Sequence, residues 1–258
     1  MPRNFCGFRL AVAILTVALV TCGSSYAAAS RSAEGGDSLT VVIDAGHGGH
    51  DRGGIPGQRV AEKDMTLDVA QRLRNVLSAS GYRVVMTRDS DVFVPLPTRV
   101  AIANSYRNAI FVCIHFNATQ RRSAGGIETY FYSRNSLPLA SAIHRLVVGG
   151  APSSNRGVRR RGYYVLRKTN VPAVLVECGF LTNPTEAAYA QTASYREKLA
   201  EEIAAGVRSR NSVGSASFID QTKVARSERH HSKRSHKKSA RKKKSSSKHS
   251  SAEEASAQ

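Results

Sequence analysis

The chain contains several uninterrupted apolar runs and several segments in which apolar residues recur at helical spacing. Residues 40–44, 109–115 and 173–177 are almost entirely apolar, which is typical of strands buried on both faces of a parallel sheet. Residues 126–132 alternate between apolar and polar positions, as a half-exposed strand does. Further strands are predicted at residues 82–87 and 163–166, and helices at residues 62–80, 98–106, 137–148 and 195–208.

Predicted strands and helices alternate over most of residues 39–210. This order predicts an α/β fold: a single domain whose largely parallel, twisted sheet of about six strands is flanked by helices. Residues 153–161 contain four arginines and no apolar run, so we interpret them as a basic loop.

The first 29 residues have the pattern of a secretory signal peptide. Arg3 and Arg9 are followed by an apolar stretch at residues 10–20 and then by small residues that suit a cleavage site. The stretch is too short to span a bilayer, so we expect an exported mature chain with no transmembrane span. An uncleaved anchor, or a lipoprotein attached at Cys22, is the alternative. Residues 30–38 are small and polar and are interpreted as a linker.

Positive charge is concentrated near the C-terminus. The formal net charge is +19, and residues 223–258 alone hold 12 Lys or Arg against 3 Asp or Glu. Residues 211–258 contain few apolar side chains and are predicted to form a disordered basic tail. Anionic polymers of the cell envelope are its expected partners. A solubilising tail without a partner is the simpler interpretation. Nucleic acid is the alternative partner for such a tail, but the export signal argues against it.

Two histidines and a glutamate stand at the ends of the most apolar runs. His47 follows the first run within a glycine-rich turn, His115 ends the second run, and Glu177 ends the third. Ligands of open α/β sheets bind beyond the carboxyl ends of the strands, so we expect these side chains to meet at one edge. Glu62 begins the first long helix and is placed to face the same edge.

Such a group has the composition of a catalytic zinc site. Two imidazoles and one carboxylate leave a fourth position open for water, and a second carboxylate can act as general base on that water. The residues alone leave open whether Glu62 or Glu177 is the ligand. They also leave open two simpler interpretations, in which Glu62 complements the helix dipole and Glu177 pairs with an arginine.

Four stretches of the chain carry a family resemblance, in family order: VVIDAGHGGHDRGG, AEKDMTLDVA, RVAIANSYRNAIFVCIHFNA and RGVRRRGYYVLRKTNVPAVLVECGFLTNPTEA. Over about residues 39–207 the chain resembles the zinc-dependent N-acetylmuramoyl-L-alanine amidases of bacterial cell walls, amidase type 3. The resemblance implies one zinc ion per chain, held by His47, Glu62 and His115, with Glu177 as the catalytic carboxylate. It also implies cleavage of the amide that joins the lactyl group of N-acetylmuramic acid to L-alanine.

Three further positions bear on the substrate. Asn117 lies inside a matched stretch, and Arg156 is placed to bind carboxylates of the stem peptide, so both are expected to contact substrate. A solvated loop is the simpler interpretation of Arg156. Phe116 replaces the small residue that the family usually has before the asparagine, which leaves the shape of the sheet edge open.

The expected protein is therefore a monomeric peptidoglycan amidase that acts in the periplasm, in the cell wall or outside the cell. Another secreted zinc peptidase is the nearest alternative enzyme. A wall-binding protein without turnover is the alternative without catalysis.

We expect deletion of residues 223–258 to weaken sedimentation of the protein with intact cell-wall sacculi at low salt. The attraction should fade with added salt, because the Debye length falls from ~10 Å at 0.1 M to ~3 Å at 1 M. Turnover of a small soluble muramoyl peptide should not change. Equal sedimentation of the full and shortened chains at low salt would show that the tail has no such role.

Overall fold

The computed structural model describes Met1 and residues 39–210. Apart from Met1, the expected signal peptide, the linker through residue 38 and the basic tail lie outside the described residues. Every element described below lies within residues 39–210. None of the described helices is both long enough and apolar enough to cross a membrane.

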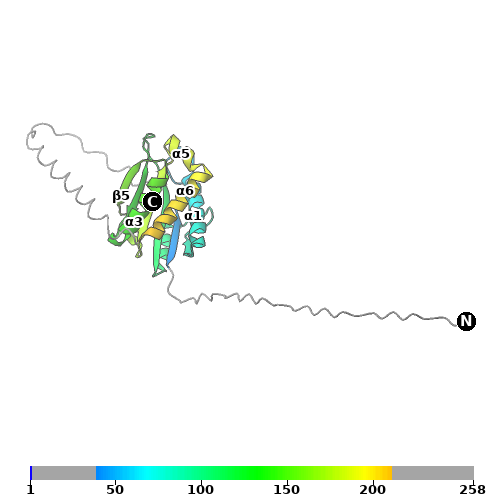
Figure 1. Ribbon diagram of the computed structural model, residues 1–258. Helices are drawn as coiled ribbons and strands as arrows, with labels where there is room; N and C mark the ends of the chain where they lie inside the picture. The colour runs from blue at the N-terminus through cyan, green and yellow to red at the C-terminus, as the bar shows by residue number, and fades with distance from the viewer. Residues whose placement is uncertain (2–38, 211–258) are drawn as a thin grey trace, which may run out of the picture. The chain divides into compact units, whose positions relative to one another are not determined.

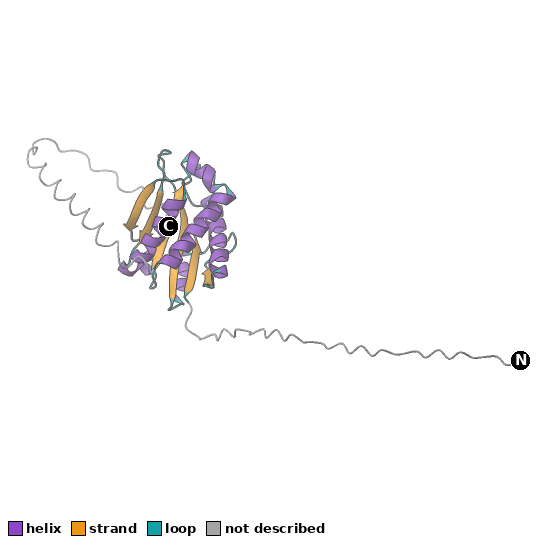
Figure 2. Cartoon of the chain, in the orientation of Figure 1, coloured by secondary structure: helices purple, strands orange, loops and turns teal. Residues whose placement is uncertain are grey.

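Strands and helices alternate along the described chain, coloured by residue number in Figure 1 and by type in Figure 2. The strands are β1 (Thr40–Ala45), β2 (Arg83–Met86), β3 (Ala109–Asn117), β4 (Ile127–Phe131), β5 (Asn155–Arg160) and β6 (Ala173–Phe180). The helices are α1 (Glu62–Ala79), α2 (Leu96–Asn104), a 3-10 turn (Arg134–Ser136), α3 (Leu137–Gly150), α4 (Tyr164–Lys168), α5 (Pro184–Ala190) and α6 (Ala193–Ser209).

The six strands form one sheet in the order β2-β1-β3-β6-β4-β5. Every neighbouring pair is parallel except β4 and β6, which run antiparallel. The central strands β1, β3 and β6 therefore end at the same edge of the sheet. The predicted α/β fold with a largely parallel sheet of about six strands is confirmed.

Helices cover both faces of the sheet. α1, α3 and α6 pack on one face, and α1 and α6 lie side by side in Figure 1. α2 and α4 pack on the other face. Because side chains alternate along a strand, Val41 and Ile43 face the first layer whereas Val42 faces the second.

The same alternation decides where the polar residues at the strand ends point. His115 lies on the same side of β3 as Phe111 and Cys113, and Glu177 lies on the same side of β6 as Leu175. This is the side that α2 and α4 cover. Phe116 lies on the opposite side of β3 and packs in the core beneath α1, α3 and α6. Its side chain therefore points away from the polar edge, and the departure from the family pattern leaves that edge unobstructed.

Two elements differ from the sequence-based expectation. The predicted basic loop contains a strand, β5, which pairs only with β4 and lies at the edge of the sheet. An edge strand buries little surface and needs no apolar run. Its arginine-rich sequence therefore resembles that of a loop. Residues 163–166 are not a strand. Tyr163 precedes the short helix α4, which begins at Tyr164 and whose Val165 and Leu166 are buried against the sheet.

A buried ion pair joins β1 to α2 below the polar edge. Arg99 Nη1 lies 2.8 Å from Asp44 Oδ1, and the two side chains are only 3% and 1% exposed. Thr87 Oγ1 also donates to Asp44 Oδ1, over 2.5 Å. Burial alone would raise the pKa of Asp44, but Arg99, Cys113 and Thr87 outweigh it and hold that pKa below its ordinary value.

We expect Asp44→Ala to destabilise the fold by about 3–5 kcal/mol, because it leaves the Arg99 charge buried without its partner. Chemical unfolding of both proteins measures this. The folded pKa of Asp44 lies below 3.8, so its contribution is present at neutral pH and is lost as pH falls below that value. The difference in free energy of unfolding between wild type and Asp44→Ala should therefore become smaller in acid.

Lys198→Ala is the matched control, because it removes an exposed ion pair with Glu202. It should leave the free energy of unfolding close to that of the wild type, because an exposed ion pair contributes little. Equal effects of the two substitutions would contradict this account of Asp44.

Candidate active site

The turn after β1 holds its histidine in a rare backbone conformation. His47 has φ 60°, the sole positive φ outside glycine among the described residues, and Gly48 and Gly49 have φ 131° and 60°. A Cβ atom on Gly46 would lie 2.4 Å from Cε1 of His115. The glycines are therefore needed both for the path of the chain and for the approach of the two imidazoles.

Two buried arginines fix this turn by binding its carbonyl oxygens. Arg88 donates to the carbonyls of Ala45 and Gly46 over 2.9 and 2.8 Å, and Arg99 donates to that of His47 over 2.7 Å. Neither arginine is predicted from the sequence as a site residue. Arg88 stands in a polar segment after a strand, where most arginines are solvated. Arg99 begins one of the four matched stretches, but no hydrophobic pattern marks it as buried.

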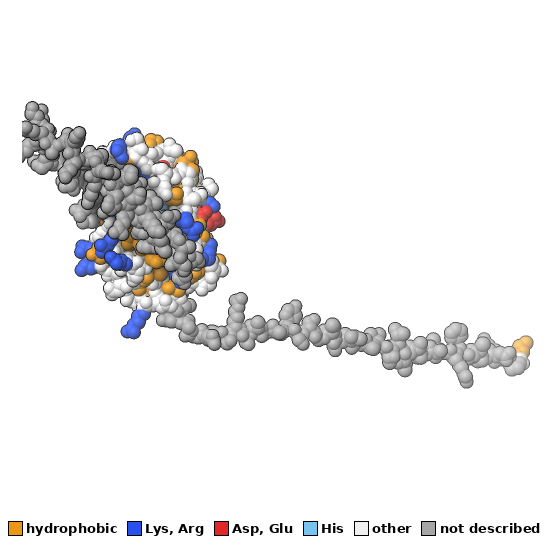
Figure 3. Space-filling view, turned by 60° about the vertical axis from the view of Figure 1, so that its left-hand side comes forward, with side chains coloured by type: hydrophobic (Ala, Val, Ile, Leu, Met, Phe, Trp, Pro, Cys, Tyr) orange, Lys and Arg blue, Asp and Glu red, His pale blue; other side chains and the backbone are white. Residues whose placement is uncertain are grey.

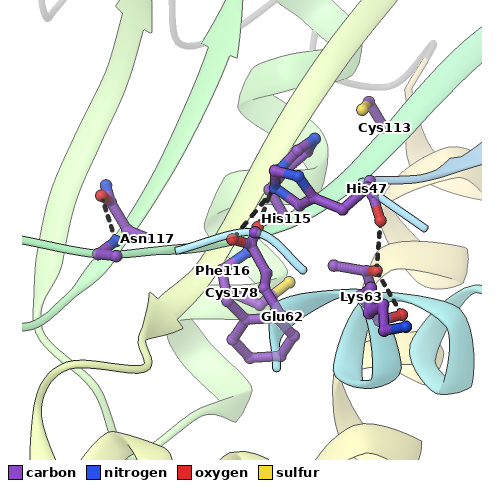
Figure 4. Close-up of polar contacts among 12 residues, drawn as sticks. His47, Glu62, Lys63, Cys113, His115, Phe116, Asn117 and Cys178 are labelled. Carbon is purple, nitrogen blue, oxygen red and sulfur yellow. Dashed lines mark hydrogen bonds and ion pairs between the residues drawn. The ribbon is translucent and has the colours of Figure 1, made fainter. Parts of the chain in front are cut away.

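His47, Glu62 and His115 come together at the carboxyl edge of the sheet, from the turn, from the first residue of α1 and from β3. All three are buried, and one potential ligand atom from each lies within 4.8 Å of the other two. Glu62 Oε1 lies 2.9 Å from His115 Nδ1, and Glu62 Oε2 lies 3.2 Å from His47 Nε2. Figure 4 shows the three side chains pointing toward one another.

Neighbouring groups fix the orientation of these side chains. Asp51 Oδ2 lies 2.8 Å from His47 Nδ1 and so directs the other ring nitrogen toward Glu62. The backbone N–H of Phe116 donates to Glu62 Oε1 over 2.9 Å. A carboxylate behind a histidine is the usual support of a metal-binding imidazole.

The donor set fits a divalent cation. His47 Nε2 and Glu62 Oε2 are buried and have no hydrogen-bond partner within the part of the chain that the structure describes. They lie close together but are not aligned for a hydrogen bond, as expected of two ligands directed at a common point. Two imidazoles and a carboxylate suit zinc.

The protonation of this group is coupled to metal binding. Burial alone would lower the pKa of His47, but Glu62 and Asp51 raise it to about 10. Burial alone would raise the pKa of Glu62, but His47 and His115 lower it to about 2. A cation bound between these groups must displace the proton of His47, so metal affinity should fall as pH falls.

Glu177 stands beside the His47–Glu62–His115 group, in the next strand of the sheet. It is the register partner of His115, is 4% exposed, and has a buried Oε2 without a hydrogen-bond partner among the described residues. No arginine in the described chain pairs with it, which removes the simpler interpretation of this carboxylate. Burial, followed by the anions of Glu62 and Glu128, raises the pKa of Glu177 well above its ordinary value.

Asn117 and Arg156, the expected substrate-binding residues, meet at Glu128, a buried glutamate that is not predicted from the sequence. Asn117 Nδ2 donates to Glu128 Oε2 over 3.2 Å, and Arg156 Nε lies 3.4 Å from the same oxygen. Contact with substrate stays a prediction for both. The alternating pattern of residues 126–132 could have placed Glu128 on the face of Glu177 if the strand order had been known.

Two cavities reach the His47–Glu62–His115 group. One of about 320 Å³ is lined by His47, His50, Asp51 and the loop at residues 52–58. The other, of about 210 Å³, lies between His47, His115 and apolar side chains that include Phe93 and Val165. The buried His47–Glu62–His115 group therefore borders open space on two sides.

We expect Gly46→Ala to weaken metal binding by about tenfold to a hundredfold, because the new methyl group displaces the His115 ring. Zinc competition with a coloured chelator measures this in the purified protein. Gly149→Ala is the control, since a Cβ there meets nothing within 4 Å. Unchanged zinc affinity in Gly46→Ala would contradict the described arrangement of the ligands.

Three comparisons relate the chain to known proteins. Residues 41–209 match the model of the N-acetylmuramoyl-L-alanine amidase family. The uncharacterised Bacillus subtilis protein YqiI is 38% identical over 197 residues, covering 74% of this chain and 95% of YqiI. The N-acetylmuramoyl-L-alanine amidase LytC of Bacillus subtilis is 38% identical over 168 residues, covering 64% of this chain but only 34% of LytC.

A solved structure agrees with these sequence matches. The catalytic domain of CwlV, an N-acetylmuramoyl-L-alanine amidase from Bacillus (Paenibacillus) polymyxa var. colistinus, is 33% identical and superposes with a TM-score of 0.65. The match covers 68% of this chain and 99% of that domain. The family match spans more than half of the chain and includes all four residues of the candidate site. The chain belongs to the N-acetylmuramoyl-L-alanine amidase family.

Proposed function

We propose that this protein is an exported, zinc-dependent amidase that hydrolyses the bond between N-acetylmuramic acid and L-alanine in peptidoglycan. The observation that supports it most directly is the buried His47–Glu62–His115 group, with two ligand atoms aimed at one point and a free carboxylate, Glu177, in the adjacent strand. Cell-wall remodelling or cell separation is the setting in which such cleavage serves the cell.

The residues present suit amide hydrolysis. Zinc bound by His47, Glu62 and His115 would acidify a water molecule and polarise the amide carbonyl. Glu177 accepts the proton of the attacking water at its carboxylate and returns it to the departing amine of L-alanine. A nearby cation favours the ionised form of Glu177, which a proton acceptor needs.

The protein's own contacts prepare this site before substrate arrives. Arg88 and Arg99 hold the turn, Asp51 holds the His47 ring, and the N–H of Phe116 holds Glu62. Ligands fixed in this way need little rearrangement when the metal binds. Asn117 and Arg156 border the substrate side of Glu177 in this proposal.

The proposed location is the periplasm or the cell wall and exterior. The signal-like residues 1–29 and a wall substrate both support it. One zinc ion per chain and a monomer suffice, since all proposed ligands come from one chain. In this proposal the basic residues 223–258 keep the enzyme near anionic envelope polymers.

Digestion of purified peptidoglycan with mass analysis of the fragments tests the proposal. The expected products are stem peptides with a free L-alanine amine and glycan strands with intact lactyl groups. Cuts between amino acids of the stem would favour another secreted zinc peptidase instead. Binding of the zinc-loaded protein to the wall without any released fragment would favour a wall-binding protein.

We expect Glu177→Gln to keep zinc and to lower kcat by about 10²–10⁴-fold, because an amide cannot take the proton from water. Zinc content and turnover of a soluble muramoyl peptide are measured on the same sample. Glu201→Gln, an exposed change on α6, should leave both unaltered. Near-normal turnover by Glu177→Gln would rule out its role as proton acceptor.

A further inference from the structure

Glu128 extends a row of polar side chains across the sheet. On β4 it is the register partner of Glu177 on β6, which is in turn the partner of His115 on β3. All three lie on the face covered by α2 and α4. Neighbouring strands are about 4.8 Å apart, so Glu128 stands about 10 Å from His115, with Glu177 between them.

Four polar groups surround the carboxylate of Glu128, which is itself 4% exposed. Its Oε2 accepts from Tyr130 over 2.8 Å and from Asn117 over 3.2 Å. Two cations lie against it: Arg156 Nε is 3.4 Å from Oε2, and Arg159 Nε is 3.2 Å from Oε1. One buried anion thus faces two guanidinium groups, and one positive charge is left without a counterion in this cluster.

The Arg156 side chain is held in place on several sides. Its guanidinium lies over the ring of Phe180, 5.0 Å from the centroid. Its stem crosses Gly126, where an added Cβ would lie 2.5 Å from Cγ of Arg156. A guanidinium fixed between an aromatic ring and a carboxylate loses little freedom when it binds a ligand.

Donors on both arginines are free to bind something else. Among the described residues, Nη2 of Arg156 and both Nη groups of Arg159 have no hydrogen-bond partner, and the two side chains are 29% and 44% exposed. Figure 3, turned so that the β5 side of Figure 1 comes forward, shows many Lys and Arg side chains and few acidic ones. This surface therefore favours an anion.

We propose that Arg156 and Arg159, positioned by Glu128, bind the free carboxylate of the second residue of the peptidoglycan stem. This inference rests on the proposed function, which places the scissile amide at Glu177. Glu128 lies one strand spacing, about 4.8 Å, from Glu177, and the arginines lie against it. This distance corresponds to about one to two stem residues beyond the scissile amide. Paired guanidinium donors match the two oxygens of a carboxylate, so the cluster selects stems in which this group is free rather than amidated.

Two soluble muramoyl tripeptides, identical except for a free or amidated carboxyl on the second residue, test the preference. For the zinc-loaded wild type we expect kcat/KM to be about tenfold to a hundredfold higher for the substrate with the free carboxyl than for the amidated one. The difference should arise mainly from a lower KM. In Arg156→Gln the ratio of the two kcat/KM values, free carboxyl to amidated, should be close to one. Arg160→Gln, on the same strand but packed over Tyr132, should keep the wild-type ratio.

Glu128→Gln separates positioning from a purely structural role. It keeps the shape of the side chain but removes the anion that holds both arginines. We expect the free-to-amidated ratio to fall while kcat for the free stem changes less than KM. If Glu128→Gln fails to fold, the partly exposed Arg156→Gln still decides the question.

A binding measurement keeps this inference distinct from the proposed amidase activity. Calorimetry would titrate the free-acid and amidated tripeptides, without muramic acid, into wild type and Arg156→Gln. Tighter binding of the acid by wild type alone supports the cluster even if neither muramoyl substrate is cleaved, in which case the proposed function is wrong. Equal cleavage and equal binding of both stems by wild type would overturn the inference and leave the amidase activity standing.

Discussion

The turn that carries His47 depends on two buried guanidinium groups. Arg88 and Arg99 bind the carbonyls of three successive residues, and Asp44 neutralises Arg99 from below. Buried charges are costly unless they are paired or hydrogen-bonded. Arg99 has both an anionic partner and carbonyl acceptors, whereas Arg88 is hydrogen-bonded to carbonyl oxygens. The positive φ of His47 is a strained conformation that persists because these contacts determine it. Without them the imidazole would not face Glu62.

The register of the sheet places three functional side chains in one row across neighbouring strands. His115, Glu177 and Glu128 occupy neighbouring strands at the same level, about 4.8 Å apart. Their environments differ. His115 contacts Glu62, and Glu177 has a buried oxygen without a hydrogen-bond partner in the part of the chain that the structure describes. Glu128 accepts hydrogen bonds from Tyr130 and Asn117. In the proposed mechanism these are a ligand, a proton carrier and a support for the arginines.

Much of this arrangement could be predicted from sequence because it follows from long apolar runs. Those runs place His115 and Glu177 on central strands, and the glycine-rich turn marks His47. The residues alone could not choose between Glu62 and Glu177 as ligand, since that choice depends on how α1 packs. Glu128 was missed because its role depends on the antiparallel pairing of β4 with β6. The edge strand β5 was missed because pairing on one side only permits an arginine-rich sequence.

Anomalous X-ray scattering at the zinc edge, from crystals of the purified protein, tests the central claim most directly. The account predicts one zinc peak per chain, bound by His47, Glu62 and His115, with Glu177 nearby but not coordinated. A zinc ion that takes Glu177 as a ligand in place of Glu62, or zinc-treated crystals with no peak between the two histidines, would contradict it.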